Sequence, residues 1–446
     1  MLLIFVPKLT NRTGYTINVV MRDMLHVEFA ITTDADTFAN HDGPKLCYGP
    51  QPVGPADVPF LQSAKLLFET QIQDVACGCF RHQDIPVLFP VFSSQSALPF
   101  DPFAAIFYML SRYEEMLPFI GDEHGRFPVS QSIAYKNGFL GTAVVDRWAL
   151  MVRDLLQQRY PDLYFAPRQY AFEPTIDIDA AYCYKHKGVF RTTLGILRDG
   201  LKRHAPQEVR RRIAVIRGQE ADPYDTFDYI LETARELAPR AQLTFFALLG
   251  DYGMYDKPAS YSCNQFRQLI QHLRDYAKVG IHGSYYSADE PERIEREVER
   301  LSDILHRPIV RNRFHFLRFT LPYAYQNLVG NGITHDYSMG FSEVNGFRCG
   351  TCNEYPFFDL TTNQETQLHI HPFIAMDTTM NSHLGLSPDE AAAAYRSLID
   401  ETRAVGGTFC CIFHNQNLCE DFGWEGWRAV FEEVMRYAAA NTNKPR

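Results

Sequence analysis

Apolar and polar residues follow one pattern before about residue 165 and another pattern after it. In the first part, short runs such as Tyr15–Met21 and His26–Thr32 alternate between apolar and polar residues and are separated by clusters rich in Pro and Gly. Alternation of this kind favours short strands joined by turns. The opening sequence MLLIFVP favours one more strand, and residues 145–160 form an amphipathic stretch before the change. We therefore predict a small α+β domain over residues 1–165.

One helix in this first part has clear boundaries. Asp101 can cap it, Pro102 fits its first turn, and apolar residues return at every third or fourth position from Phe103 to Tyr113. Its polar side carries Arg112 and the pair Glu114–Glu115. Paired carboxylates can act in catalysis, but a solvated helix end is the commoner arrangement, and we expect these side chains to face solvent.

The second part, residues 166–446, alternates apolar runs of strand length with segments of helical periodicity. The strand-like runs are 170–178, 242–249, 279–281, 309–319, 368–375 and 408–413. The helical segments between them are 231–237, 266–276, 294–305 and 391–399. Regular alternation predicts βα units around a parallel sheet, either open or closed into a barrel. In such sheets the functional site lies at the carboxyl ends of the strands.

Composition narrows the classes of protein that fit this pattern. A net charge of -10 and a pI near 5.8 argue against a nucleic-acid partner, because binding to phosphates needs a dense field of Lys and Arg. No apolar window is long enough for a membrane span, and no secretory signal is visible, so we expect a cytoplasmic protein. The ten Cys lack a regular spacing and are expected to be free thiols, although Cys349 and Cys352 could also hold zinc.

Two carboxylates close the first strand-like run of the second part. Asp177 and Asp179 are two positions apart, so they share one face of a strand. Neighbouring carboxylates repel each other unless a cation lies between them, they share a proton, or water screens them. The pair therefore indicates either a metal site with a base beside it or an acidic strand end in solvent.

Imidazole and guanidinium groups close three later runs. His282 follows residues 279–281, Arg313 and His315 lie in the run from 309, and His414 follows residues 408–413. A single His in such a place is more often part of a structural hydrogen bond than a ligand. Acids and imidazoles at successive strand ends, however, together predict a catalytic constellation.

The order of these motifs resembles that of the polysaccharide deacetylase (NodB-homology) family. Thr175-Ile-Asp177-Ile-Asp179 is similar to the family's first motif, Thr-Phe-Asp-Asp, but is one residue wider. The sequences His282-Gly-Ser-Tyr-Tyr286, Arg313-Phe-His315 and Ile412-Phe-His414 correspond to the later motifs. As a whole the chain resembles a bacterial subgroup with an extra N-terminal domain of unassigned function. The resemblance implies a deformed (β/α) barrel after that domain.

The resemblance also implies an activity: metal-dependent hydrolysis of an N-acetyl or other acyl group from an amino sugar in a glycan or glycan precursor. It assigns Asp179 and His282 as ligands of a divalent metal, with zinc expected. It assigns Asp177 as the base, His414 as the acid that protonates the leaving amine, and Arg313 as the residue that orients Asp177.

Tyr286 stands where the family has its second metal His, and we hypothesise that His315 supplies the missing ligand. Together with Tyr286, the residues Arg318, His371 and Asp377 are expected around the substrate. The alternative is a protein that has lost catalysis and binds carbohydrate or a partner without hydrolysis.

Overall fold

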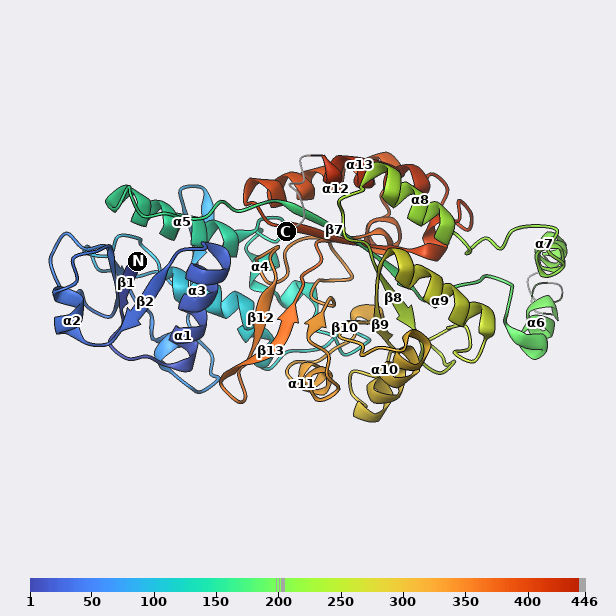
Figure 1. The fold of residues 1–446 in the computed structure, drawn as a ribbon, viewed down its shortest axis with the longest axis horizontal. Coiled ribbons are helices and arrows are strands. Elements are labelled where there is room, and N and C mark those ends of the chain that lie inside the picture. The colour runs from blue at the N-terminus through green and yellow to red at the C-terminus, as the bar shows by residue number, and fades with distance from the viewer. Residues whose placement is uncertain (198, 200, 202–204, 441–446) are drawn as a thin grey trace.

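The computed structural model describes residues 1–446 apart from 198, 200, 202–204 and 441–446. The molecule is elongated, with the N-terminal sheet at one end, a large sheet in the middle, and α6 (Gly188–Leu197) and α7 (Pro206–Ile216) at the other end (Figure 1). No helix in the described part combines the length and the hydropathy that a membrane span needs.

The N-terminal part is built on a parallel sheet of four strands in the order β2-β1-β3-β4. The strands are β1 (Leu2–Phe5), β2 (Phe29–Thr32), β3 (Lys45–Gly49) and β4 (Phe60–Gln62), and a separate hairpin pairs β5 (Cys79–His82) with β6 (Ile85–Leu88). The helices are α1 (Asn11–Asn18), α2 (Ala35–Ala39), α3 (Pro102–Leu110), α4 (Ile133–Lys136) and α5 (Val144–Arg159). The strand predicted at the start of the chain is confirmed, and so are the caps of α3 by Asp101 and Pro102.

The strand predicted for Tyr15–Met21 is wrong. Thr10 and Thr13 form a capping box that starts α1, and a π-helix (Val19–Met24) continues it. Nearly every apolar side chain of this segment is buried, so the pattern of apolar residues does not show which faces of the helix contact the core.

The large sheet has nine strands in the order β12-β13-β11-β10-β9-β8-β7-β15-β14, all parallel except β12. The strands are β7 (Ala171–Ile178), β8 (Thr244–Leu248), β9 (Lys278–Gly283), β10 (Arg311–Phe314), β11 (His335–Asp336), β12 (Tyr355–Asp359), β13 (Gln364–Ile370), β14 (Ala375–Met376) and β15 (Thr408–His414). The other helices are α8 (Phe227–Leu237), α9 (Asn264–Tyr276), α10 (Pro291–Leu305), α11 (Tyr323–Gly330), α12 (Pro388–Ala404) and α13 (Trp427–Ala439).

The predicted α/β class with a parallel sheet is therefore confirmed. Closure into a barrel is not shown, because in the described residues no hydrogen-bonded pairing joins the edge strands β12 and β14.

The sheet nevertheless curls, and its inner face is filled by side chains from distant strands. Phe246 of β8 contacts Tyr337, which follows β11, with ring centroids 5.1 Å apart. Both belong to a buried cluster with Leu317, Phe373, Met376, Cys410 and Ile412. Side chains of the described residues fill this interior, so no channel runs through the centre of the sheet. A ligand can therefore reach the ends of the strands only from the two mouths of the curled sheet.

A buried ion network joins the N-terminal part to the large sheet. Arg112, which has a left-handed φ of 50° just after α3, donates to Glu115 over 2.7 Å, to Glu114 over 2.8 Å and to the Arg348 carbonyl over 2.7 Å. Arg348 itself forms two hydrogen bonds to Glu115. These residues are buried, so the prediction of a solvated helix end is wrong. The sequence signal was ambiguous because the cationic partner lies more than 200 positions away.

The apolar core is also continuous across residue 165. The Tyr15 ring of α1 packs at a tilt against Phe358 of β12, with ring centroids 5.0 Å apart, and its hydroxyl donates to the Pro356 carbonyl over 2.8 Å. The division of the chain into domains at residues 1–165 and 166–446 stays a prediction. Whatever its boundaries, the N-terminal part packs against the sheet through a shared core.

The ion network gives a stability prediction. Replacing Arg348→Ala leaves Glu115 buried with one cation instead of two, and we expect a loss of about 3–5 kcal/mol in the free energy of unfolding. Chemical denaturation of the full chain measures this. The control Arg267→Ala removes an exposed pair with Asp303 and should cost less than about 1 kcal/mol. Equal effects of the two variants would show that the network adds nothing.

Candidate functional site

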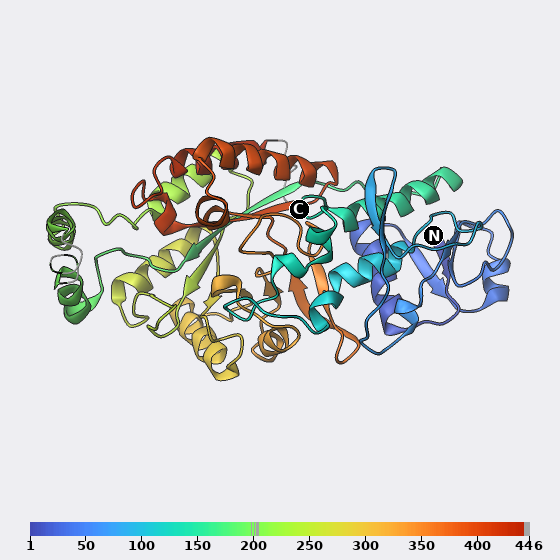
Figure 2. The ribbon, with the colours of Figure 1, turned by 180° about the vertical axis from the view of Figure 1, so that it is seen from behind.

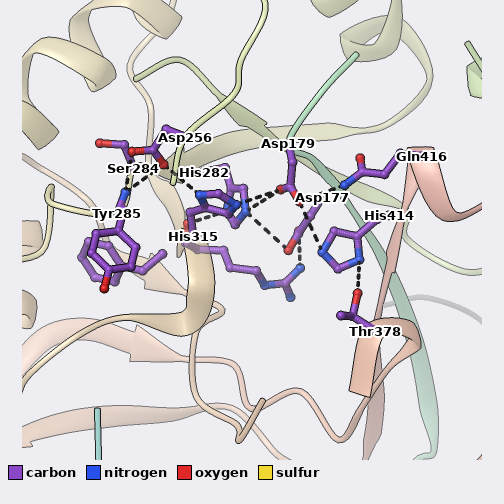
Figure 3. A network of polar contacts seen from close by, with 12 residues as sticks. Asp177, Asp179, Asp256, His282, Ser284, Tyr285, His315, Thr378, His414 and Gln416 are labelled. Carbon is purple, nitrogen blue, oxygen red and sulfur yellow. Dashed lines mark hydrogen bonds and ion pairs between the residues drawn. The ribbon is translucent and has the colours of Figure 1, made fainter. Parts of the chain in front are cut away.

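Five polar side chains predicted from the sequence meet at the carboxyl ends of β7, β9, β10 and β15. They are Asp177, Asp179, His282, His315 and His414, and all five line one cavity of about 220 Å³. Figure 3 shows them pointing toward one another. The structure thus brings together residues separated by more than 230 positions in the sequence.

Asp177 is held by Arg313. The guanidinium Nη1 donates to Asp177 Oδ1 and to Thr175 Oγ1, both over 2.7 Å, and Nε donates to the Tyr337 carbonyl over 2.9 Å. Arg313 is fully buried and stacks on Phe246 with 4.5 Å between the guanidinium carbon and the ring centroid. A cation in this place fixes the orientation of the Asp177 carboxylate.

Two imidazoles direct a nitrogen toward Asp179. His282 Nδ1 lies 2.8 Å from the Arg313 carbonyl, which can only accept, so Nδ1 carries the proton. His315 Nδ1 lies 2.8 Å from Asp256 Oδ1. In each ring Nε2 is the inner atom, 3.2 Å from Asp179 Oδ1 for His282 and 3.6 Å for His315. Imidazoles that bind metals are commonly held in this way by a hydrogen bond on the outer nitrogen.

Asp179 supplies the third ligand atom of a possible metal site. Its Oδ1 is buried and has no hydrogen-bond partner, while Oδ2 accepts from Gln416 Nε2 over 2.9 Å. Ligand atoms of Asp179, His282 and His315 all lie within 4.8 Å of one another. One carboxylate and two imidazoles are a set of ligands that zinc accepts. A buried carboxylate oxygen without a hydrogen-bond partner is unfavourable, and a bound cation would stabilise it. The residues therefore fit a divalent metal.

The charge balance of the site also favours a cation. Four carboxylates, those of Asp177, Asp179, Asp256 and Asp377, surround the imidazoles. Arg313 is the guanidinium bonded to this group. Burial alone would lower the pKa of His315, but Asp179 and Asp256 outweigh it and raise this pKa to about 9. The excess of negative charge draws either protons or a metal ion to these rings.

His414 faces Asp179 from β15. Its Nδ1 lies 2.7 Å from Asp377 Oδ1, and its Nε2 lies 3.8 Å from Asp179 Oδ2. Burial would lower the pKa of His414, but the Asp377 and Asp179 carboxylates outweigh it and raise the pKa to about 10. Asp377 also accepts from the His414 backbone and from Asn417. The His414 ring is thus held in a fixed orientation and carries a proton at neutral pH.

The turn that carries His315 is strained. Phe316 and Leu317 have φ angles of 61° and 51°, in the left-handed region that side chains other than Gly rarely adopt. Arg126 donates to the Phe316 carbonyl over 2.7 Å and lines the same cavity. The segment from residue 111 to 143 runs along the large sheet, as seen in cyan from behind in Figure 2, so the N-terminal part supports the turn.

Four residues predicted to surround the substrate lie elsewhere than expected. Tyr286 and Arg318 do not line this cavity; they belong to an aromatic group beside it that includes Tyr285. Asp377 is fully buried against His414 and so orients that ring instead of facing a ligand. His371 lines a different cavity among the first residues of the strands, which does not support its assignment to this site.

Sequence reasoning missed several residues of the site. Asp256 lies in the loop between β8 and α9, well beyond the end of the strand, so its position against His315 depends on how this loop folds back. Arg126 lies in a polar turn, where it also donates to Asp122. Thr378 and His383 line the cavity from the segment after β14. The Gln416 and Asn417 pair directly after His414 was the one available signal, because amide groups at a strand end are suited to hold carboxylates.

A larger cavity of about 710 Å³ lies beyond residue 181 and carries different chemistry. Its wall has Arg191, Arg212 and Lys257 stacked on Tyr side chains, and it lacks the acids and imidazoles described above. The smaller cavity is the better candidate site, because among the cavities described it is the one in which Asp177, His414 and the group Asp179, His282 and His315 meet.

Comparison with known proteins adds little to this geometry. A model of a family of unknown function (DUF7033) matches residues 2–161. No curated protein matches the sequence. Among solved structures, a candidate polysaccharide deacetylase from Mycobacterium smegmatis is 16% identical, with a TM-score of 0.41 over 61% of this chain and 85% of that one.

Two further solved structures are similar at the same level. A candidate polysaccharide deacetylase from Pseudomonas aeruginosa is 13% identical, with a TM-score of 0.37 over 61% of this chain and 86% of that one. An allantoinase is 10% identical, with a TM-score of 0.37 over 61% and 85% of the two chains. Similarity this weak carries no argument about activity.

The support of His315 by Asp256 gives a prediction. Asp256→Asn keeps an oxygen that can accept from the Tyr285 backbone but removes the negative charge beside His315 Nδ1. We therefore expect the zinc affinity of this site to fall about 10–100-fold. Calorimetric titration of the metal-depleted chain measures it. Asp251→Asn, an exposed acid in the same loop, is the matched control and should leave the affinity unchanged. Full affinity in Asp256→Asn would remove His315 from the ligand set.

The loop after His282 gives a prediction on pH. Ser284 donates from its backbone and hydroxyl to the buried Glu297, and burial raises the pKa of Glu297 from 4.5 to about 7. The folded chain then holds a proton that the unfolded chain releases, so stability falls as pH rises from about 4.5 to 7, by on the order of 3 kcal/mol. Glu297→Gln, a neutral mimic, should flatten this slope in denaturation series at several pH values. An unchanged slope would refute this assignment.

Proposed function

We propose that this chain is a metal-dependent hydrolase that removes an acetyl or other acyl group from the nitrogen of an amino sugar in a glycan or glycan precursor. One observation carries the proposal. Asp179 Oδ1, His282 Nε2 and His315 Nε2 converge in a cavity that also holds Asp177 on one side and His414 on the other. A ligand set with a base and an acid beside it is what amide hydrolysis requires.

Asp179, His282 and His315 would hold the metal, with zinc the expected ion. A divalent ion in this place would polarise the acyl carbonyl and lower the pKa of water. Three protein ligands leave a position open, as catalytic zinc sites do.

Asp177 is the proposed base. Its Oδ2 lies 3.8 Å from His282 Nε2, so it borders the ligand set, while Oδ1 is occupied by Arg313. One carboxylate oxygen is thus fixed and the other remains free to accept a proton from the attacking water. Arg313 keeps that oxygen aimed at the cavity.

His414 is the proposed acid. Its raised pKa means that it holds a proton at neutral pH, and Asp377 holds Nδ1, so the proton on Nε2 faces the cavity. Donation of this proton to the leaving nitrogen converts a poor amide leaving group into a free amine. Asp177 and His414 lie on adjacent strands, aligned in register, and so act at neighbouring positions along the cavity.

The cavity itself limits what can enter. At about 220 Å³ it holds an acyl group and part of a ring, and Leu317 and Met376 give it an apolar wall against which a methyl group can pack. The amino-sugar substrate is proposed from the sequence motifs, and the cytoplasmic location repeats the expectation from the sequence. A protein in the cytoplasm would meet a glycan precursor sooner than a finished wall polymer.

A second candidate is a protein on the same scaffold that binds carbohydrate or a partner without hydrolysis. The observation that favours it is the charge of His315: with a pKa of about 9 this ring can neutralise Asp179 with a proton instead of a metal ion. Metal content separates the two proposals, because a binding module of this kind would need no ion.

The proposed roles predict different results for two neighbouring carboxylates. Asp179→Asn should lose both the metal and acetate release, whereas Asp177→Asn should keep the metal and lose at least about 100-fold in rate. Acetate release from a panel of N-acetylated amino sugars, with zinc or cobalt added, gives the rate, and elemental analysis gives the metal.

The exposed Asp303→Asn is the control and should behave as the original chain. Thermal unfolding of each variant shows whether it is folded. Absence of acetate release by the original chain with every metal, together with absence of bound metal, would sink the hydrolase and favour the binding module.

A further inference from the structure

A second group of imidazoles lies at the opposite mouth of the curled sheet, at the start of β11 and the end of β13. It lines a cavity of about 190 Å³ whose wall includes Glu173 of β7, Lys278 of β9 and Arg311 of β10. The filled interior of the sheet, including Tyr337 and Phe246, separates this cavity from the proposed active site. Nothing in the proposed hydrolysis uses it.

Three side chains converge in this cavity with the geometry of ligands. His335 Nδ1 and His371 Nε2 lie 2.9 Å apart, and Glu354 Oε2 lies 3.7 Å from the same His371 nitrogen. Ligand atoms of the three residues all lie within 4.8 Å of one another. Two lone-pair nitrogens that face each other at this distance must share a proton or a cation.

A second set of contacts holds these ligands in place. His369 Nδ1 lies 2.6 Å from Glu354 Oε1, the carboxylate oxygen that faces away from His371. The Tyr337 ring stacks on the His371 ring, with centroids 4.3 Å apart and planes 6° apart, and the Tyr337 hydroxyl donates to Glu173 over 2.9 Å. Orientation of the first ligands by such outer partners is typical of metal sites.

We propose that His335, His371 and Glu354 form a second divalent-metal site, independent of the proposed active site. The donor set of two imidazoles and one carboxylate selects zinc, cobalt or nickel over calcium or magnesium, which prefer oxygen ligands. Glu354 is partly exposed, so a fourth position is open to water.

The charged residues around this cavity nearly cancel, so the type of ligand atom decides which metal ion binds. Glu173 and Glu354 balance Lys278 and Arg311 in the cavity wall, so no strong field of either sign acts on an ion.

The site would tie together the edge of the open sheet. His335 begins β11, His371 follows β13, and Glu354 precedes the edge strand β12. These three strands are neighbours at the end of the sheet where β12 lacks a partner on its outer side within the described residues. A metal bound there would therefore act as a structural clamp and not as a catalyst.

The test counts metal ions in the full chain purified without a histidine tag. The metal-depleted chain is titrated with zinc and with cobalt, whose visible absorption reports imidazole ligands, and compared with His371→Ala, Glu354→Gln and His282→Ala. We expect His371→Ala to lose one ion per chain while His282→Ala keeps that ion. His369→Ala should keep the site with affinity lowered about 10–100-fold. His272→Ala, an exposed imidazole on α9, is the control.

The outcomes separate this proposal from the proposed function. If one ion is lost only in His371→Ala and Glu354→Gln, the second site stands even when the active site holds no metal. If zinc binding is the same in the original chain and in these two variants, both folded by thermal unfolding and circular dichroism, the second site is overturned. Within the His282→Ala background, a rise in melting temperature on adding zinc that disappears with His371→Ala gives an independent readout.

Discussion

One buried guanidinium connects most of the strands that form the candidate site. The guanidinium of Arg313, on β10, donates to Thr175 and Asp177 of β7 and to the Tyr337 carbonyl after β11. The Arg313 backbone carbonyl accepts a hydrogen bond from His282 Nδ1 of β9. The flat face of the guanidinium lies on Phe246 of β8. A charge buried this completely is stable only while its partners are in place, so the curl of the sheet and the geometry of the site depend on each other.

The same site holds four carboxylates, and Arg313 is bonded to one of them, Asp177. Carboxylates orient both His315 and His414, and a third, Asp179, keeps one oxygen without a hydrogen-bond partner. Each of these contacts costs desolvation free energy unless a cation joins them. This excess of buried negative charge is consistent with the proposed binding of a positive ion.

The sequence predicted much of this arrangement, for reasons that particular residues make clear. Strands β8 and β15 are almost wholly buried and read as apolar runs. The polar residues near the ends of β7, β9 and β15, namely Asp177, His282 and His414, stand out against their apolar neighbours. The hypothesis that His315 lies with Asp179 and His282 agrees with the observed geometry, while its role as a ligand stays a proposal.

What sequence reasoning missed depends on contacts between distant segments. Asp256 and Arg126 lie in loops whose local patterns resemble ordinary solvated turns. His371 was expected with the active-site group, but the parallel pairing of β13 with β11 places it beside His335 instead. Glu115 was expected in solvent because its partner Arg348 cannot be inferred from local periodicity.

The contact between Arg126 and the Phe316 carbonyl has a consequence for how such a protein could be shortened or recombined. The left-handed turn at Phe316 and Leu317 is held from outside by a residue of the N-terminal part. A polypeptide beginning near residue 166 would retain every proposed ligand and yet lack the brace that keeps His315 facing inward. The first third of the chain thus supports the site that it adjoins, and a graft of the later segment onto another protein would need substitutes for this guanidinium and for the shared core.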